Sequence, residues 1–190
     1  MIRQAQPTDY EAIKDIDEKL TIDTQKISER DYLSNMERSG FLVQNTFTLE
    51  KFEKEITTTF LVTEIEEKIV GYLRIEDATY LDKERPAIVY KPELVESQIK
   101  KPYKYLDRIS LLPEYRGRKL ASKMLTAAEK LLKNEEVGYL YSFVVVSPIT
   151  NTASIIFHDY NGFERVDISK TFTFAGFENY QSFKYCKKLL

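Results

Sequence analysis

The sequence predicts an α+β fold of the α/β/α type, in which helices cover both faces of a sheet, and three stretches carry this prediction. Residues 106–132 follow the pattern of a strand, a tight loop and an amphipathic helix. Residues 139–146 are almost continuously apolar, as in a central strand that is buried on both faces. Residues 151–162 have helical spacing and end in Asn-Gly, which is typical of a helix C-terminus.

The N-terminal part of the chain predicts one short strand and three helices. The strand is expected at 2–5, and a helix follows it because Thr8 and Glu11 have the spacing of a capping box. The apolar residues of this helix recur every three or four positions, at Ala12, Ile13, Ile16 and Leu20. Further helices are expected at 28–40, where a glycine ends the pattern, and at 49–56.

The next stretch predicts a β-hairpin. Two runs rich in β-branched and aromatic residues, 60–65 and 69–76, are separated by Glu66-Glu67-Lys68. Gly71 lies inside the second run, and a residue without a side chain is typical there of a bulge or of a close approach by another backbone.

Between 77 and 103 the periodicity is weak, and three prolines interrupt it. A short helix near 92–99 is the one element expected in this segment. A connection of this length is more often functional or mobile than idle, although a surface excursion without a role is the alternative.

The C-terminal part predicts two closing strands, at 163–168 and 182–187, joined by a longer loop around Ala175-Gly176. The sequence contains no internal repeat, no low-complexity tract and no second domain that we can recognise. One domain is therefore expected over 1–190.

Composition limits the classes of partner and the compartment. The chain has a net charge of −2 and is 43% hydrophobic, so nothing in it favours nucleic acid or an anionic membrane as a partner. The N-terminus lacks the apolar core of a signal peptide, and no run approaches the length of a membrane span. The single cysteine, Cys186, excludes an internal disulfide and a cysteine-rich metal site. We expect a cytoplasmic protein without a metal.

A basic loop precedes the helix of the first stretch. Arg116, Arg118 and Lys119 place three positive side chains where a helix begins. The first turn of a helix has unpaired N–H groups and the positive end of the helix dipole. Such a loop would suit a pyrophosphate, and the alternative is a solvated basic rim with no ligand.

Two motifs, in this order, resemble those of the GCN5-related N-acetyltransferase (GNAT) superfamily. The loop pattern of that family is Arg or Gln, two residues, Gly, one residue, and Gly or Ala, and residues 116–121 read Arg-Gly-Arg-Lys-Leu-Ala. Lys119 therefore stands where the family usually has glycine. The family's later helix has Asn, a small residue and then Tyr, and this chain has Asn151, Ser154 and His158 on one helix face, followed by Gly-Phe.

The resemblance implies a mixed, mostly antiparallel sheet that is splayed between its fourth and fifth strands, with coenzyme A in the gap. It also implies a shorter link than 77–103, so we interpret this segment as an insertion near the acceptor side. The implied cofactor-binding residues are Ile109, Ser110, Leu111, Arg116, Gly117, Arg118, Lys119, Leu120, Ala121, Asn151 and Ser154.

The implied reaction transfers an acetyl group from acetyl-CoA to a primary amine of a small molecule, an amino acid or a peptide, by direct attack in a ternary complex. His158 is the expected acid for the departing thiolate, because proton transfer from imidazolium to thiolate is favourable. It could instead deprotonate the amine through a water, or be a buried structural histidine. Asp107 and Tyr105 are the candidate bases, with Glu76 as a weaker third.

An alternative function is a binding module that keeps the fold and acetyl-CoA as a sensor or an assembly surface. The loop also lacks the Gly-Lys-Ser/Thr ending of a P-loop, which argues against a different nucleotide site. The sequence identifies no acceptor and leaves the oligomeric state open, with a homodimer as one alternative.

Overall fold

The computed structural model describes residues 1–43, 48–56, 58–77, 86–95 and 98–190. Residues 78–85 and 96–97 of the predicted insertion at 77–103 lie outside the described residues. The chain forms two compact units, which we describe separately. The first contains Met1–Thr21, Leu42–Glu76 and Leu106–Glu136, and the second contains Ile22–Phe41, Asp77–Tyr105 and Val137–Leu190. The expectation of a single domain over 1–190 stays a prediction.

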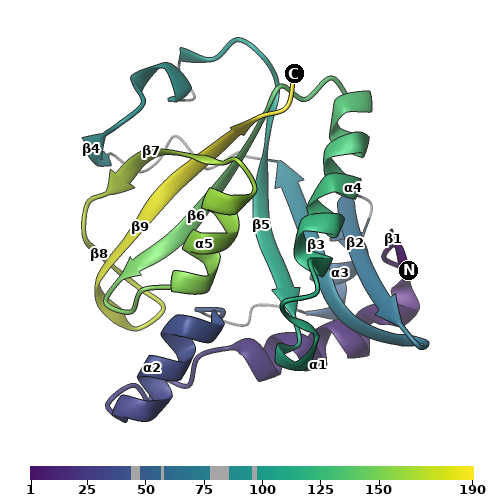
Figure 1. Ribbon diagram of the computed structural model, residues 1–190, viewed down its shortest axis with the longest axis horizontal. Coiled ribbons are helices and arrows are strands. Elements are labelled where there is room, and N and C mark those ends of the chain that lie inside the picture. The colour runs from purple at the N-terminus through teal and green to yellow at the C-terminus, as the bar shows by residue number, and fades with distance from the viewer. Residues whose placement is uncertain (44–47, 57, 78–85, 96–97) are drawn as a thin grey trace. The chain divides into compact units, whose positions relative to one another are not determined.

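The first unit contains four strands in the order β1-β2-β3-β5 (Figure 1). The strands β1 and β2 pair antiparallel, as do β2 and β3. Three helices belong to this unit: α1, α3 and α4. The bounds are β1 (Ile2–Gln4), β2 (Thr59–Ile65), β3 (Lys68–Asp77), β5 (Tyr103–Leu111), α1 (Tyr10–Leu20), α3 (Leu49–Glu55) and α4 (Leu120–Asn134).

The core of the first unit follows from the alternation along its strands. Phe60, Val62 and Tyr72 are fully buried and pack with Ile13 of α1 and Phe52 of α3. The residues that alternate with them point to the opposite face, which α4 covers (Figure 1). Helices therefore cover both faces of this part of the sheet, as predicted.

Gly71 has both properties that the sequence predicted. The hairpin register shifts between Thr63 and Glu64, opposite Gly71, which marks a bulge. A Cβ at Gly71 would lie 2.5 Å from the carbonyl oxygen of Ser110 and would also overlap the side chain of Leu111. The glycine is thus required by the close approach of β3 to β5.

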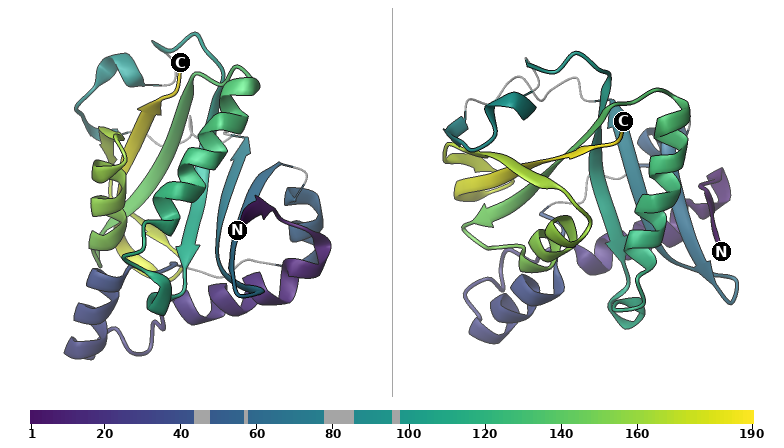
Figure 2. Two further views of the ribbon diagram at one scale, coloured as in Figure 1. Left: turned by 45° about the vertical axis from the view of Figure 1, so that its right-hand side comes forward. Right: turned by 45° about the horizontal axis from the view of Figure 1, so that its top comes forward.

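The second unit contains the strand order β6-β9-β7-β4, and β8 pairs with β9. All these pairs are antiparallel, whereas Tyr103–Tyr105 of β5 pairs in parallel with Tyr139–Tyr141 of β6. Helix α5 packs on β6 and also contacts α2 (Figure 2). The bounds are β4 (Pro86–Val89), β6 (Tyr139–Ser147), β7 (Glu164–Ser169), β8 (Phe172–Phe174), β9 (Phe177–Lys188), α2 (Arg30–Ser39) and α5 (Thr152–Tyr160).

The structure corrects several expectations. The capping box at Thr8 is wrong: a short 3-10 turn over Pro7–Asp9 precedes α1, and Asp9 accepts a hydrogen bond of 2.8 Å from the backbone N–H of Gln6. The helix predicted near 92–99 is only a 3-10 turn over Pro92–Leu94 in the described residues. The strands β4 and β8 were not predicted. None of the described helices is long and apolar enough to span a bilayer.

Candidate active site

The predicted strand, loop and helix are present in the first unit. Strand β5 ends at Leu111, a 3-10 turn covers Pro113–Tyr115, and α4 begins at Leu120. The N–H of Leu112 bonds to the carbonyl oxygen of Val70 at 2.9 Å, which fixes the end of β5 against β3. The loop at 116–119 therefore leaves a rigid strand and enters a long helix.

Two residues of this loop have left-handed backbone conformations. Gly117 has a φ of 74°, and a Cβ there would meet no described atom within 4 Å. Lys119 has a φ of 60° and a ψ of 19°, and it is the N-cap residue of α4. The lysine therefore adopts the conformation for which the family pattern usually supplies glycine. This conformation costs an L-residue roughly 1–2 kcal/mol.

The backbone at the start of α4 is available to an anion. The side chain of Lys119, the N-cap residue, makes no capping hydrogen bond to the first turn. The first N–H groups of a helix have no intrahelical partner, and the helix dipole is positive at this end. Backbone amides and positive charge are thus placed together, as pyrophosphate recognition requires.

The arginines of the loop have different surroundings. The Nε of Arg116 donates to the carbonyl oxygen of Leu111 at 3.1 Å, which ties the loop to the last residue of β5. Burial lowers the pKa of the Arg116 guanidinium, and the charge of Glu114 opposes this effect. Arg118 is exposed and lies over the ring of Tyr115, 5.1 Å from its centroid. Arg116 therefore has a structural contact, whereas Arg118 presents charge at the surface.

Strand β5 brings the other predicted cofactor-binding residues next to the loop. Ser110 and Leu111 are buried, whereas Ile109 is only half-buried. Within the first unit, the structure therefore brings residues 109–111 and 116–121 together, through the contact of Arg116 with Leu111.

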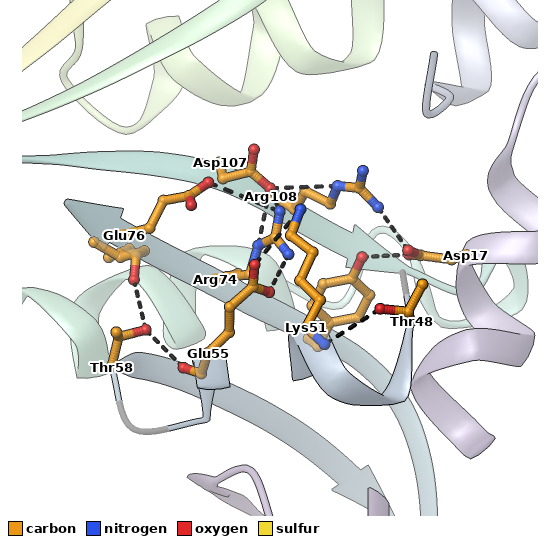
Figure 3. A network of polar contacts seen from close by, with 11 residues as sticks. Asp17, Thr48, Lys51, Glu55, Thr58, Arg74, Glu76, Asp107 and Arg108 are labelled. Atoms are coloured by element: carbon orange, nitrogen blue, oxygen red, sulfur yellow. Dashed lines mark hydrogen bonds and ion pairs between the residues drawn. The ribbon is translucent and has the colours of Figure 1, made fainter. Parts of the chain in front are cut away.

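A buried network of ion pairs surrounds Arg74 of β3 (Figure 3). The guanidinium of Arg74 bonds to Asp107 of β5, with 3.0 Å from Nε to Oδ2, and to Glu55 of α3. Its NH2 group also lies 3.8 Å from Oε1 of Glu76. The side chain of Arg74 is only 2% exposed, so this charge is stabilised by carboxylates rather than by water.

The network continues to α1 through Arg108. Arg108 donates to Oδ2 of Asp17 at 2.6 Å and lies 3.3 Å from Asp107. Tyr72 donates to the other oxygen of Asp17, which is completely buried. Burial raises the pKa of Asp17, whereas Arg108 and the Tyr72 hydrogen bond oppose that rise. This ion pair joins α1 to the sheet.

Glu76 is, with Asp17, a carboxylate of the network whose pKa is raised. Burial raises its pKa to about 7, the negative charge of Asp107 contributes to the rise, and Arg74 opposes it. The structure therefore places two of the predicted base candidates side by side, with Glu76 and Asp107 on one guanidinium. The resemblance favoured Asp107 and Tyr105 over Glu76, and the pKa shift of Glu76 depends on groups from other elements that the sequence does not bring together.

Tyr105, the other candidate base, belongs to the second unit. Its side chain is buried in an apolar cluster with Tyr141, Val166 and Cys186. The ring lies 5.7 Å from that of Phe143. These surroundings favour a packing role for Tyr105.

Asn151 and Ser154 also lie in the second unit, at the start of α5. The Oδ1 of Asn151 accepts from the N–H of Ser154 at 3.1 Å, and its Nδ2 donates to the carbonyl oxygen of Phe41 at 3.0 Å. Asn151 is therefore the N-cap of α5, and it also hydrogen-bonds to Phe41, two residues after the end of α2. Both polar groups of its side chain are engaged within this unit.

His158 is 2% exposed and packs between the rings of Phe163 and Tyr185. Its Nδ1 donates to the carbonyl oxygen of Ser154 at 2.7 Å, and no described group hydrogen-bonds to Nε2. Burial lowers the pKa of His158 to about 4. The imidazole is thus neutral at neutral pH, so the geometry favours the structural alternative over the imidazolium donor that we expected.

Most of the ion-pair network could not be predicted from the sequence. One signal of the network is present there: Tyr72, Arg74 and Glu76 place polar groups at alternate positions of an otherwise apolar strand. A charged residue on the buried face of a strand indicates a partner, because isolated buried charges are costly.

The comparisons with known proteins agree with the fold. The family model described as the acetyltransferase (GNAT) family matches residues 23–163. No curated protein matches the sequence. Solved structures do match it over nearly the whole chain.

Three of these structures illustrate the likeness. The PaiA N-acetyltransferase of Thermoplasma acidophilum, solved with coenzyme A, is 18% identical, with a TM-score of 0.62 over 99% of this chain and 98% of that one. A ribosomal-protein-alanine N-acetyltransferase of Brucella melitensis is 18% identical, with a TM-score of 0.63 over 99% of both chains. The ribosomal-protein-S18-alanine N-acetyltransferase of Escherichia coli is 14% identical, with a TM-score of 0.62 over 100% of this chain and 93% of that one.

Proposed function

Because the chain belongs to the acetyltransferase (GNAT) family, a family that uses acyl-CoA, we propose that it transfers an acetyl group from acetyl-CoA to a primary amine. The amine attacks the thioester directly while both substrates are bound. The acceptor is a small molecule, an amino acid or a peptide amino group.

The observation that supports the proposal best is the loop at 116–121. Its two left-handed residues turn the backbone at the start of α4, and its amides meet the positive end of the helix dipole. Arg118 and Lys119 are exposed and add charge to the same place. A phosphate-bearing ligand fits such a loop. The solved relative from Thermoplasma acidophilum, which contains coenzyme A, has a similar fold.

Each part of the site has a task in this proposal. The amides of Arg116–Ala121 bind the pyrophosphate, and the backbone of Ile109–Leu111 binds the pantetheine arm. A backbone N–H near Leu111 stabilises the oxyanion that forms during attack. We leave His158 out of the proton transfers, because a neutral imidazole whose only ring N–H is bound to the carbonyl of Ser154 has no proton to give.

The proposal is tested by mixing the protein with acetyl-CoA and a panel of amines: spermidine, alanine and a peptide with a free α-amino group. We expect release of free thiol above the rate without amine for at least one acceptor, and a gain of one acetyl group in the mass of that acceptor. Tight binding of acetyl-CoA without thiol release for any amine would contradict the proposal and favour a binding module.

A further inference from the structure

The ion-pair network around Arg74 contains more negative than positive groups. Its carboxylates in the described residues are Asp17, Glu55, Glu76 and Asp107. Its cations are Arg74, Arg108 and Lys51, whose Nζ lies 3.5 Å from Glu55. Among the described residues named here, four carboxylates face three cations, so one negative charge is in excess and a proton can balance it.

Of the ion pairs between these carboxylates and cations, that of Glu76 with Arg74 has the longest distance. Asp107 takes the hydrogen bonds from Nε and NH2 of Arg74, whereas Oε1 of Glu76 lies 3.8 Å from the same NH2 group. A second carboxylate beside the first disfavours its own charged form. Glu76 is therefore the carboxylate of this pair that takes up and releases a proton most readily near neutral pH.

Glu76 is also the carboxylate of the network that solvent reaches most easily. Its side chain is 26% exposed and that of Asp107 is 20% exposed, whereas Asp17 is completely buried and Glu55 is 12% exposed. A group that exchanges protons with a substrate must be reachable, and the rest of the network must stay in place to keep its properties. Glu76 is the partly exposed group that a substrate can reach, and the buried Arg74 keeps the rest of the network in place.

We propose that Glu76 accepts the proton of the acceptor ammonium, and that Asp107 and Arg74 are positioning residues that keep Glu76 ready to do so. This inference rests on the proposed acetyl transfer. The pKa of Glu76, about 7, suits a general base at neutral pH.

The carboxylate of Glu76 takes one proton from the ammonium of the acceptor. The lone pair that this releases on nitrogen forms the C–N bond to the acetyl carbon. The C–S bond then breaks, and the electron pair of that bond leaves with sulfur as thiolate. The second proton lost by nitrogen neutralises the thiolate, and Glu76 returns the first proton to solvent.

The pH dependence of the reaction can test the role of Glu76, because its pKa depends on neighbouring charges that can be replaced. Among the described residues, they are Asp107 on β5, Arg74 on β3 and Glu55 on α3. Asp107 raises the pKa of Glu76 and Arg74 lowers it. Replacing Asp107 by asparagine removes the raising charge and frees Arg74 to bind Glu76. Both effects lower the pKa of Glu76.

The experiment measures kcat against pH for the wild type, Glu76→Gln, Glu76→Asp and Asp107→Asn, with acetyl-CoA and an amine that the panel identifies. We expect Glu76→Gln to lose roughly 10²- to 10⁴-fold in kcat, the usual contribution of a general base, while its affinity for acetyl-CoA stays unchanged. Glu76→Asp should recover part of the rate. Asp107→Asn should move the acidic limb of the profile to lower pH by about one unit or more.

Glu64→Gln is the matched control. Glu64 lies in the same unit, pairs with Arg3 at 3.3 Å and has a side-chain exposure of 22%, close to that of Glu76. We expect its profile to follow the wild type. An unchanged rate and profile in Glu76→Gln, or an acidic limb that stays in place in Asp107→Asn, would overturn the inference while leaving acetyl transfer intact.

A readout that does not need activity is the carboxyl titration of Glu76, followed by the ¹³C shift of its side chain in the wild type and in Asp107→Asn. We expect titration near neutral pH in the wild type and at lower pH in the variant. Titration of wild-type Glu76 at the ordinary value of a solvated glutamate, about 4.3, would overturn the inference. Absence of thiol release from the wild type with every amine would instead overturn the proposed function, and the inference that rests on it.

Discussion

Lys119 should change stability and cofactor affinity in opposite directions when it is replaced by glycine. Its φ of 60° and ψ of 19° place it in the left-handed region, at the N-cap of α4. It is exposed, so its replacement removes few packing contacts. The backbone strain and the positive charge of this residue can therefore be separated by substitution.

The expected gain in stability is small but measurable. Relief of the left-handed conformation is worth roughly 1–2 kcal/mol. The greater freedom of glycine in the unfolded chain offsets about 0.4–1 kcal/mol of this. We therefore expect Lys119→Gly to raise the free energy of unfolding by roughly 0.5–1 kcal/mol.

The expected loss in affinity follows from the charge. A unit charge about 4 Å from a phosphate in surroundings as polar as water is worth about 1 kcal/mol. Lys119→Gly should therefore bind acetyl-CoA about fivefold more weakly than the wild type at low salt. The difference should shrink as salt is added, because exposed charges are screened.

Lys119→Ala is the matched control, because alanine removes the same charge and keeps the strain. Urea unfolding gives the stability of the three proteins, and calorimetric titration with acetyl-CoA gives the affinity. Both variants should lose the same affinity, and only the glycine variant should gain stability. A glycine variant that unfolds at lower urea than the alanine variant would refute the strain argument, and unchanged affinity in both would remove Lys119 from the phosphate site.

Three further changes test other parts of the structure. Gly117→Glu should abolish binding of acetyl-CoA in calorimetric titration while the circular dichroism stays that of the wild type, whereas Gly117→Asn, which tolerates a positive φ and adds no charge, should lose less. Burial lowers the pKa of His158 from 6.5 to about 4, so between these pH values only the unfolded chain binds a proton at this residue. The free energy of unfolding should therefore fall by about 3 kcal/mol in total as the pH is lowered through this window. His158→Phe should flatten this pH dependence in urea unfolding. Asp17→Asn removes the buried carboxylate that pairs with Arg108 at 2.6 Å and should cost about 3 kcal/mol, whereas Asp15→Asn on the exposed side of α1 should change the unfolding midpoint little.

The strand, loop and helix at 106–132 could be predicted because their signals are local. Pro113 ends the strand, a basic loop follows, and the apolar stripe of α4 has helical spacing. The structure shows α4 beginning at Leu120. The sequence did not predict the loop conformation at Lys119, where the family usually has glycine. In the structure Lys119 adopts the left-handed backbone conformation itself.

The strand β4 could not be predicted because its partner is distant and its residues are exposed. It consists of Pro86–Val89 at the edge of the sheet, and Ile88 is 56% exposed. The partner strand is β7, which begins at Glu164. No alternation of buried and exposed residues marks such a strand in the sequence.

The chemistry of Glu76 and His158 could not be predicted for a related reason. The neighbours that decide how Glu76 titrates come from α3 and β5, and Arg108 and Asp17 of the same network are 91 residues apart. The motif places His158 on a promising helix face, but Phe163 and Tyr185 bury it. A single sequence gives residue types, whereas protonation depends on which residues meet.

Gly71 controls the spacing of two strands by having no side chain. A single added methyl group would push against the carbonyl of Ser110 and displace the strand end on which the proposed oxyanion donor sits. A random-mutagenesis screen for inactive clones should therefore recover changes at Gly71 as well as changes in the loop at 116–121. Such clones would be classed as active-site mutants although the altered residue touches neither reactant.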